Sequence, residues 1–255
     1  MRRWAWLCLV LGTWAAAGER AFPFTFDSAT LEPGERQVQF WETFRSQRFD
    51  PAPYLTTESR FGLAAGVTKS LDTLLLLDAT INEQDPDLRT IRARVSSLWK
   101  YSFLKATDAL GVSGLGRVSL GLDGLDLEAR LVLDKQLGPV LIALNASVAY
   151  SPLWNGAVEP DLRFEESLAL GYRVGPVLVG VEARVRTAYQ QRLFEGTAYY
   201  AGPTLSWSTK WFFATLAWHA QLGAYKAKAD RGNGEAMELR DNERFVARFL
   251  IGWRL

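Results

Sequence analysis

The chain has 255 residues and a formal net charge of +1, from 29 basic and 28 acidic side chains. This balance lacks the strong positive bias of nucleic-acid-binding proteins, so we expect no nucleic acid as a partner. Beyond the N-terminus, no apolar stretch approaches the roughly 20 residues of a membrane-spanning helix.

Residues 1–17 have the pattern of a secretory signal peptide. Two arginines follow the initiating methionine, an apolar run fills residues 4–14, and three alanines at 15–17 offer a cleavage site. Cleavage there leaves Gly18 as the first residue of the mature chain. Cys8 is the only cysteine, so the mature chain is expected to have no disulfide, no thiolate nucleophile and no cysteine metal ligand.

Residues 18–34 precede the first predicted strand. Aromatic side chains stand beside a proline in the stretch 21–26. This composition suits either a short periplasmic tail or a plug that folds into a barrel. We expect the tail.

From residue 35 to the end, apolar and polar residues alternate with period two, which predicts strands with two different faces. In residues 125–134, for example, leucines and an alanine alternate with charged side chains. About twelve strands follow, each long enough for a tilted membrane crossing. The predicted strands are 35–49, 54–68, 73–82, 89–103, 111–122, 125–134, 139–150, 160–173, 177–189, 197–209, 211–223 and 242–255. Glu42 departs from the pattern by falling on an apolar face, which suggests a rim position or a bulge.

The connections between these strands fall into two sets. Tight turns are expected at 69–72, 135–138, 175–176 and 209–210, and longer polar loops at 82–88, 151–159, 190–196 and 224–241. Short periplasmic turns that alternate with longer outer loops are typical of bacterial membrane barrels. The fold expected for residues 35–255 is therefore all-β, a single antiparallel transmembrane β-barrel with both termini on the periplasmic side.

A soluble barrel also alternates, so other features must decide between the two. Glycine, alanine and serine are frequent on the polar face, as in the crowded inside of a barrel, and aromatic residues gather near strand ends, as at lipid headgroup levels. The last strand resembles the C-terminal signature of bacterial outer-membrane proteins, which the barrel-assembly machinery reads. Its outward residues are Phe249, Ile251, Trp253 and Leu255, where the last is usually phenylalanine. These features favour a bacterial outer membrane, with its lipid as surroundings.

Two further stretches resemble a narrower set of uncharacterised Gram-negative outer-membrane proteins. The first is residues 31–34, with sequence LEPG, leading into 37–43; the second is 59–67, followed by a turn and 74–78. The resemblance implies the barrel fold and no assigned activity.

Charged residues on the polar face form the candidate lumen. Opposite charges often lie two residues apart on one strand, so they are expected to pair rather than remain desolvated and alone. One interpretation is a structural ion-pair network, and the other is a pore in which a surplus of arginine selects solutes. The candidates are Glu58, Arg60, Arg92, Arg94, Lys100, Asp126, Glu128, Arg130, Glu165, Glu182, Arg184, Arg186, Arg244 and Arg248.

Signals of enzymatic chemistry are few. His219 is the only histidine, and position 221 is glutamine. Outer-membrane phospholipase A has a serine two residues from its catalytic histidine, so that motif is absent. With a single histidine and no mature cysteine, we expect no catalytic residues, no metal site and no cofactor.

The function most consistent with this sequence is a passive pore or transporter for small solutes. The first alternative is a non-conducting structural or interaction barrel that acts through its outer loops, especially 224–241. An outer-membrane hydrolase centred on His219 is the more distant alternative.

Overall fold

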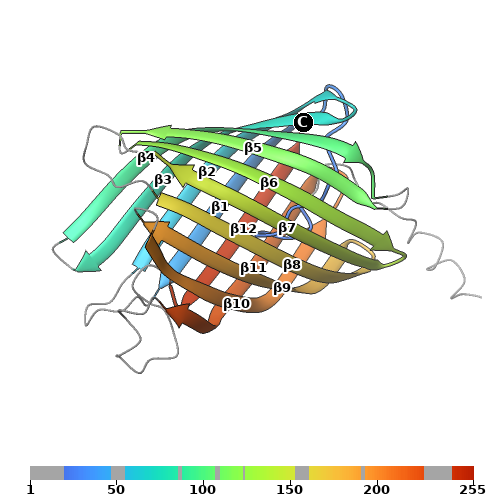
Figure 1. The fold of residues 1–255 in the computed structure, drawn as a ribbon. Helices are drawn as coiled ribbons and strands as arrows, with labels where there is room; N and C mark the ends of the chain where they lie inside the picture. The colour runs from blue at the N-terminus through green and yellow to red at the C-terminus, as the bar shows by residue number, and fades with distance from the viewer. Residues whose placement is uncertain are drawn as a thin grey trace, which may run out of the picture.

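The computed structural model describes residues 20–46, 55–85, 88–106, 110–122, 124–152, 161–190, 193–226 and 243–255. Within them, twelve antiparallel strands form a closed barrel in which each strand pairs with its sequence neighbours and the last pairs with the first (Figure 1). The predicted fold class is confirmed. The strands are β1 (Arg36–Ser46), β2 (Leu55–Thr68), β3 (Leu71–Asp85), β4 (Leu88–Leu104), β5 (Gly111–Gly121), β6 (Gly124–Leu137), β7 (Val140–Ser151), β8 (Asp161–Val174), β9 (Val177–Gln190), β10 (Leu193–Ser208), β11 (Phe212–Lys226) and β12 (Phe245–Arg254).

Tight turns connect the strands at one end of the barrel, here called the turn end. Gly138 and Gly175 each have a φ of +58° and each precedes a proline. A positive φ at the first central residue, followed by the negative φ that proline imposes, is the backbone of a type II′ hairpin turn. The opposite end, here called the loop end, differs from the prediction. Most of the loops expected at 82–88 and 190–196 belong to strands, because β3, β4 and β10 extend further than their alternation indicated.

Alternation along each strand separates an apolar outer face from a polar inner face. On β6, for example, Leu127 and Leu131 are exposed outside, while Asp126 and Asp134 are buried inside. Period-two spacing cannot reveal which face points inward, so this direction comes from the closed structure. An apolar exterior around a charged interior is the arrangement of a membrane barrel.

Aromatic rings form two rows of contacts on the outside, one near each end. Near the turn end, the Phe212 ring lies 5.7 Å from the rings of both Trp207 and Trp253. Near the loop end, Tyr189 lies between Phe164 at 6.0 Å and a second phenylalanine, Phe194, at 5.7 Å. Rings at two heights are what lipid headgroup levels favour.

Glu42 lies in the middle of β1 and faces outward. Its register with Ser59 on β2 and Phe249 on β12 is unbroken, so the expected bulge or rim position is wrong. The Ser59 hydroxyl lies 2.8 and 3.0 Å from the two carboxylate oxygens, which accept its hydrogen bond.

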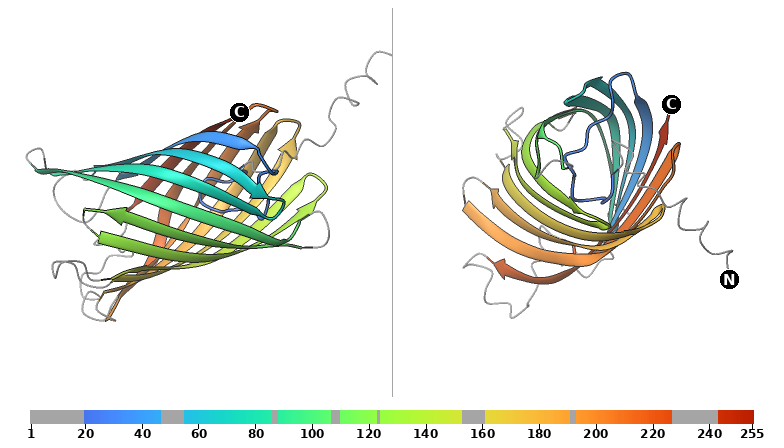
Figure 2. Two further views of the ribbon diagram at one scale, coloured as in Figure 1. Left: turned by 90° about the horizontal axis from the view of Figure 1, so that it is seen from above. Right: turned by 90° about the vertical axis from the view of Figure 1, so that its right-hand side faces the viewer.

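The segment before β1 lies inside the barrel, so the expected periplasmic tail is wrong over the described residues. We call Arg20–Gly34 the plug; its blue trace runs within the ring of strands in the right-hand view of Figure 2. It ends in a type II turn at 32–35, with a φ of +85° at Gly34 after Pro33 and a hydrogen bond of 3.0 Å from Glu35 N to Glu32 O. The physical reason for its position is that the inner wall near the turn end presents buried apolar side chains together with polar groups that bind the main chain of the plug.

That apolar wall and the plug form one packed interior. Each of three buried clusters contains plug residues: Leu31 in the first, Ala21 and Phe22 in the second, and Phe24 in the third. Without the plug, the wall leucines of these clusters would face water. None of the described residues forms a helix long and apolar enough to cross a membrane.

Candidate functional site: a charged cavity closed by the plug

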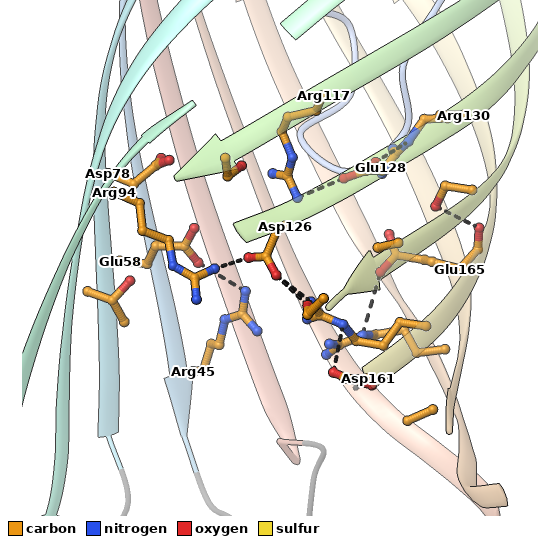
Figure 3. A pocket seen from close by; sticks show the side chains of 18 of the residues that line it. Arg45, Glu58, Asp78, Arg94, Arg117, Asp126, Glu128, Arg130, Asp161 and Glu165 are labelled. Carbon is orange, nitrogen blue, oxygen red and sulfur yellow. Dashed lines mark hydrogen bonds and ion pairs between the residues drawn. The ribbon is translucent and has the colours of Figure 1, made fainter. Parts of the chain in front are cut away.

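A cavity of about 720 Å³ lies inside the barrel on the loop-end side of the plug. Among the described residues, ten arginines and eight carboxylates line it, and its floor includes the plug residues Phe24 and Phe26 with Trp41 of β1. We call it the charged cavity (Figure 3). Its charge follows from the sequence pattern, since most inward positions toward the loop end are charged, whereas those toward the turn end include the apolar residues that pack against the plug.

Most of the candidate residues meet in this cavity. Those that line it are Glu58, Arg60, Arg92, Arg94, Asp126, Glu128, Arg130, Glu165, Arg184, Arg186 and Arg248. Three candidates lie elsewhere. Lys100 and Glu182 bind the backbone of the plug. Arg244 is exposed in the bend before β12, with its guanidinium 5.3 Å from the centre of the Phe245 ring, so its expected lumenal position is wrong.

One chain of ion pairs begins on β3 and crosses β2 and β1. Arg60 pairs with Glu58 on its own strand and lies 2.9 Å from Asp78. Arg45 then lies 3.0 Å from Glu58 and 3.2 Å from Glu243. Glu58 and Arg45 thus connect β3, β2 and β1 to Glu243, two residues before β12 begins.

The chain continues across the barrel from Glu243 to β8 and β9. Arg186 lies 3.4 Å from Glu243 and 3.5 Å from Glu165, and Arg184 lies 2.8 Å from the same Glu165 oxygen. The Glu243 side chain is only 1% exposed. Burial of a carboxylate this deep costs free energy by desolvation, and the two arginine partners offset that cost.

Further pairs occupy the β4–β8 side. Asp126 accepts from Arg94 and from the Ser151 hydroxyl, and lies 3.9 Å from Arg163. Arg163 in turn lies 3.2 Å from Asp161 at the loop end. Figure 3 shows the Asp126 carboxylate pointing into the cavity between these partners.

Glu128 binds two arginines at the floor of the cavity. Arg117 lies 2.7 Å from one of its oxygens and Arg130 lies 2.8 Å from the other. Because most lining charges are paired in this way, the geometry favours a structural network over an open row of free selecting charges. Part of the remaining positive surplus is held by aromatic rings.

Arg248 illustrates how that surplus is accommodated. No carboxylate of the described residues lies within ion-pair distance of it. Its guanidinium instead lies 4.3 Å from the Phe24 ring, 2.9 Å from the Thr43 hydroxyl and 3.2 Å from the Pro23 carbonyl. An aromatic face attracts a cation, and this attraction strengthens where water is excluded.

Several of these residues were missed in the sequence. Arg45 and Arg117 fall on the polar faces of β1 and β5, so alternation alone was sufficient to find them. Asp78 ends a run of leucines, and its inward position follows from the same rule. Glu243 lies before the last strand, where alternation does not apply. Its position in the cavity could not be predicted from neighbouring residues, because its partners Arg45 and Arg186 come from distant strands.

His219 lies outside the charged cavity. It is fully buried, its ring is 4.4 Å from the Phe24 ring, and neither ring nitrogen has a hydrogen-bond partner among the described residues. The described residues also contain no group of three or more potential metal-ligating side chains.

Comparisons with known proteins agree with the barrel architecture. Residues 141–255 match a family of unknown function (DUF6662), whereas no curated protein matches the sequence significantly. The structure resembles the COG4313 outer membrane channel from Pseudomonas putida F1, with a TM-score of 0.67 at 10% identity over 90% of this chain and 98% of the channel.

It also resembles the NanC porin, with a TM-score of 0.57 at 10% identity over 86% of this chain and 100% of the porin. For the KdgM porin the TM-score is 0.55 at 6% identity, over 85% and 98% of the two chains. Identities this low establish the fold alone. The chain has the β-barrel fold of bacterial outer-membrane channels and porins.

Proposed function

We propose that this protein resides in a bacterial outer membrane and passes small solutes through its interior. The charged cavity carries the proposal. It offers about 720 Å³ of polar space inside a closed barrel whose outer surface is apolar. Arginines outnumber carboxylates in its lining, so anions are expected to enter more readily than cations.

Ion current across planar bilayers tests this proposal. The mature chain is expected to give small current steps, since the plug occupies the route beyond the cavity, and the reversal potential in a salt gradient should show a modest preference for anions. The proposal would be overturned if neither the intact barrel nor the barrel without its plug carried current, both being correctly folded. A clear preference for cations would overturn the assignment to anions.

The filled turn-end interior favours one alternative, a non-conducting barrel that acts through its outer loops. The loop expected to matter most, 224–241, lies largely outside the described residues. Deleting residues 228–240 should abolish partner binding in that case while the barrel still folds. Unchanged binding would count against the alternative.

A hydrolase centred on His219 has less support. Its imidazole is buried against Phe24 and holds no hydrogen bond to a serine or carboxylate among the described residues. A general base needs such partners within hydrogen-bond reach. Unaltered lipid hydrolysis in His219→Ala would remove this alternative.

Lipid around the barrel leads to a prediction for Glu42. A carboxylate that faces hydrocarbon destabilises a barrel, so Glu42→Leu is expected to raise the free energy of unfolding by up to about 2 kcal/mol. Urea unfolding of the barrel in lipid vesicles measures this. Thr57→Leu, on the neighbouring strand and also facing outward, is the uncharged control. A loss of stability in Glu42→Leu would count against a lipid-facing position.

The assembly prediction also stands as a proposal. Phe249, Ile251 and Trp253 face outward on β12, and the amide of Leu255 donates to the Arg36 carbonyl at 2.9 Å. We expect the barrel-assembly machinery to read this strand before β12 pairs with β1.

A further inference from the structure

The plug is held inside the barrel in the manner of a bound peptide. Its own chain enters no β-ladder with the wall, and β1 to β12 close the barrel by pairing only with one another. Apart from the bond of 3.0 Å that Gly34 N donates to Gly66 O of β2, at the end of the plug, the wall completes its strand pairing without the plug. What binds the plug is a set of inward side chains, which act on its main chain and on its aromatic rings.

Two side chains of the wall accept hydrogen bonds from the central amides of the plug. The Glu182 carboxylate, on β9, accepts from Phe24 N at 3.1 Å and from Thr25 N at 2.9 Å. Asn145, on β7, accepts from Phe26 N at 2.7 Å through its Oδ1 and donates to Phe26 O at 2.9 Å through its Nδ2. Such bidentate pairing holds an irregular backbone in one conformation.

Two aspartates continue this recognition toward the end of the plug. Asp134, on β6, accepts from Ser28 N at 2.9 Å. Asp72, on β3, accepts from Leu31 N at 3.2 Å. The acceptors thus follow the plug around the inside of the wall, and each is buried, so each hydrogen bond forms away from water, where an unpaired partner is costly.

Donors from the wall bind the carbonyls of the plug. Thr215 donates to Arg20 O at 2.9 Å, Lys100 donates to Ala29 O, and Arg130 donates to Phe24 O at 3.3 Å. Side chains of the barrel therefore bind both amides and carbonyls along the plug.

Apolar side chains of the plug are buried against the inner wall of the barrel. The Phe24 ring contacts two guanidinium groups, that of Arg184 at 4.2 Å and that of Arg248 at 4.3 Å. Phe22 is 1% exposed and Leu31 is 2% exposed. Full burial of such a side chain contributes about 1.5–3 kcal/mol, so the plug is held strongly in the resting state.

We infer that the turn-end interior is a binding site for an extended peptide, occupied here by residues 20–31 of the same chain, and that this peptide is the stopper of the pore. The stopper role rests on the proposed function, whereas the binding site does not. On the turn-end side of the charged cavity, a second space of about 30 Å³ is lined in part by Phe26 and Leu98. Both residues also line the charged cavity. The plug thus lies between the charged cavity and the turn end.

Removal of the plug tests both the peptide-binding site and the stopper role. The mature chain lacking residues 18–31 is expected to carry at least ten times the current of the intact chain in planar bilayers. A synthetic peptide of residues 20–31 should bind the shortened barrel, as measured by the fluorescence anisotropy of a labelled copy, and should restore the low current. A scrambled peptide of the same composition is the control.

The outcomes separate the two proposals. Equal currents from the intact and shortened chains would overturn the stopper role. Failure of the correct peptide to bind better than the scrambled one would overturn the binding site. Absence of current from both chains would overturn the pore, while peptide binding would still decide on the site.

A point substitution covers the case in which the shortened chain does not fold. A Cβ added at Gly66, on β2, would collide with the backbone carbonyl of Glu32. Gly66→Ala is therefore expected to raise the current of the intact chain and to speed hydrogen exchange at the Leu31 amide. At Gly62, on the same strand, a Cβ would meet the movable ends of the Leu74 and Leu76 side chains at 2.9 Å and the Gln39 Cβ at 3.5 Å, and no backbone atom stands among these neighbours. Gly62→Ala is the matched control, and equal behaviour of the two variants would overturn the inference.

Discussion

Replacing Glu243 by alanine is expected to lower the free energy of unfolding by about 3–5 kcal/mol, the usual cost of removing one partner from a buried ion pair. Glu243 binds Arg45 at 3.2 Å and Arg186 at 3.4 Å, and its backbone carbonyl accepts from the Tyr200 hydroxyl at 3.0 Å. The substitution removes only the carboxylate. Arg45 keeps Glu58 and Arg186 keeps Glu165, but their shared charge inside the barrel is no longer balanced.

Urea unfolding followed by tryptophan fluorescence in detergent micelles measures this loss. Asp161→Ala is the control, because Asp161 also pairs with an arginine but its side chain is 36% exposed at the loop end. A pair in contact with water contributes no more than about 1 kcal/mol. The double variant Glu243→Ala with Arg186→Ala should lose less than the sum of the single variants, since the two residues act on one interaction. Equal losses at Glu243 and Asp161 would refute the prediction.

Phe24→Ala is expected to weaken the attachment of the plug by about 3–5 kcal/mol, the usual cost of truncating a buried phenylalanine. The ring packs in a cluster with Tyr200 and Val246, and it contacts the guanidinium groups of Arg184 and Arg248. Truncation leaves a cavity and also removes the aromatic face that stabilises two buried cations. Both effects act at the centre of the plug.

Hydrogen exchange of the Phe26 and Ser28 amides reports the attachment, because these amides donate to Asn145 and Asp134 only while the plug is bound. Exchange should accelerate by two orders of magnitude or more in Phe24→Ala. Phe24→Leu is the matched variant; it keeps most of the buried volume but removes the cation–π contacts, so a smaller loss of about 1–2 kcal/mol is expected. Unchanged exchange in Phe24→Ala would show that the ring does not hold the plug.

Much of the charged cavity was predictable, for a local reason. Side chains alternate across a strand with period two, so Glu128 and Arg130 must share a face wherever that strand lies. The same rule places Arg184 beside Arg186. It fails for Arg244, because the residue precedes the start of β12 and the alternation no longer applies there.

The amino-acid sequence by itself determined the number of strands, their approximate limits, the residues that share each face and the apolar row of the last strand. These properties depend on neighbouring residues and on the geometry of a single strand. Only the tertiary structure decided that the apolar face points outward, that the segment before β1 fills the turn-end interior, and that Glu243 joins Arg45 to Arg186. Each of these depends on closure of the barrel. Closure brings residues 198 positions apart into contact, and it creates an apolar inner wall that no single strand shows and that the plug must cover.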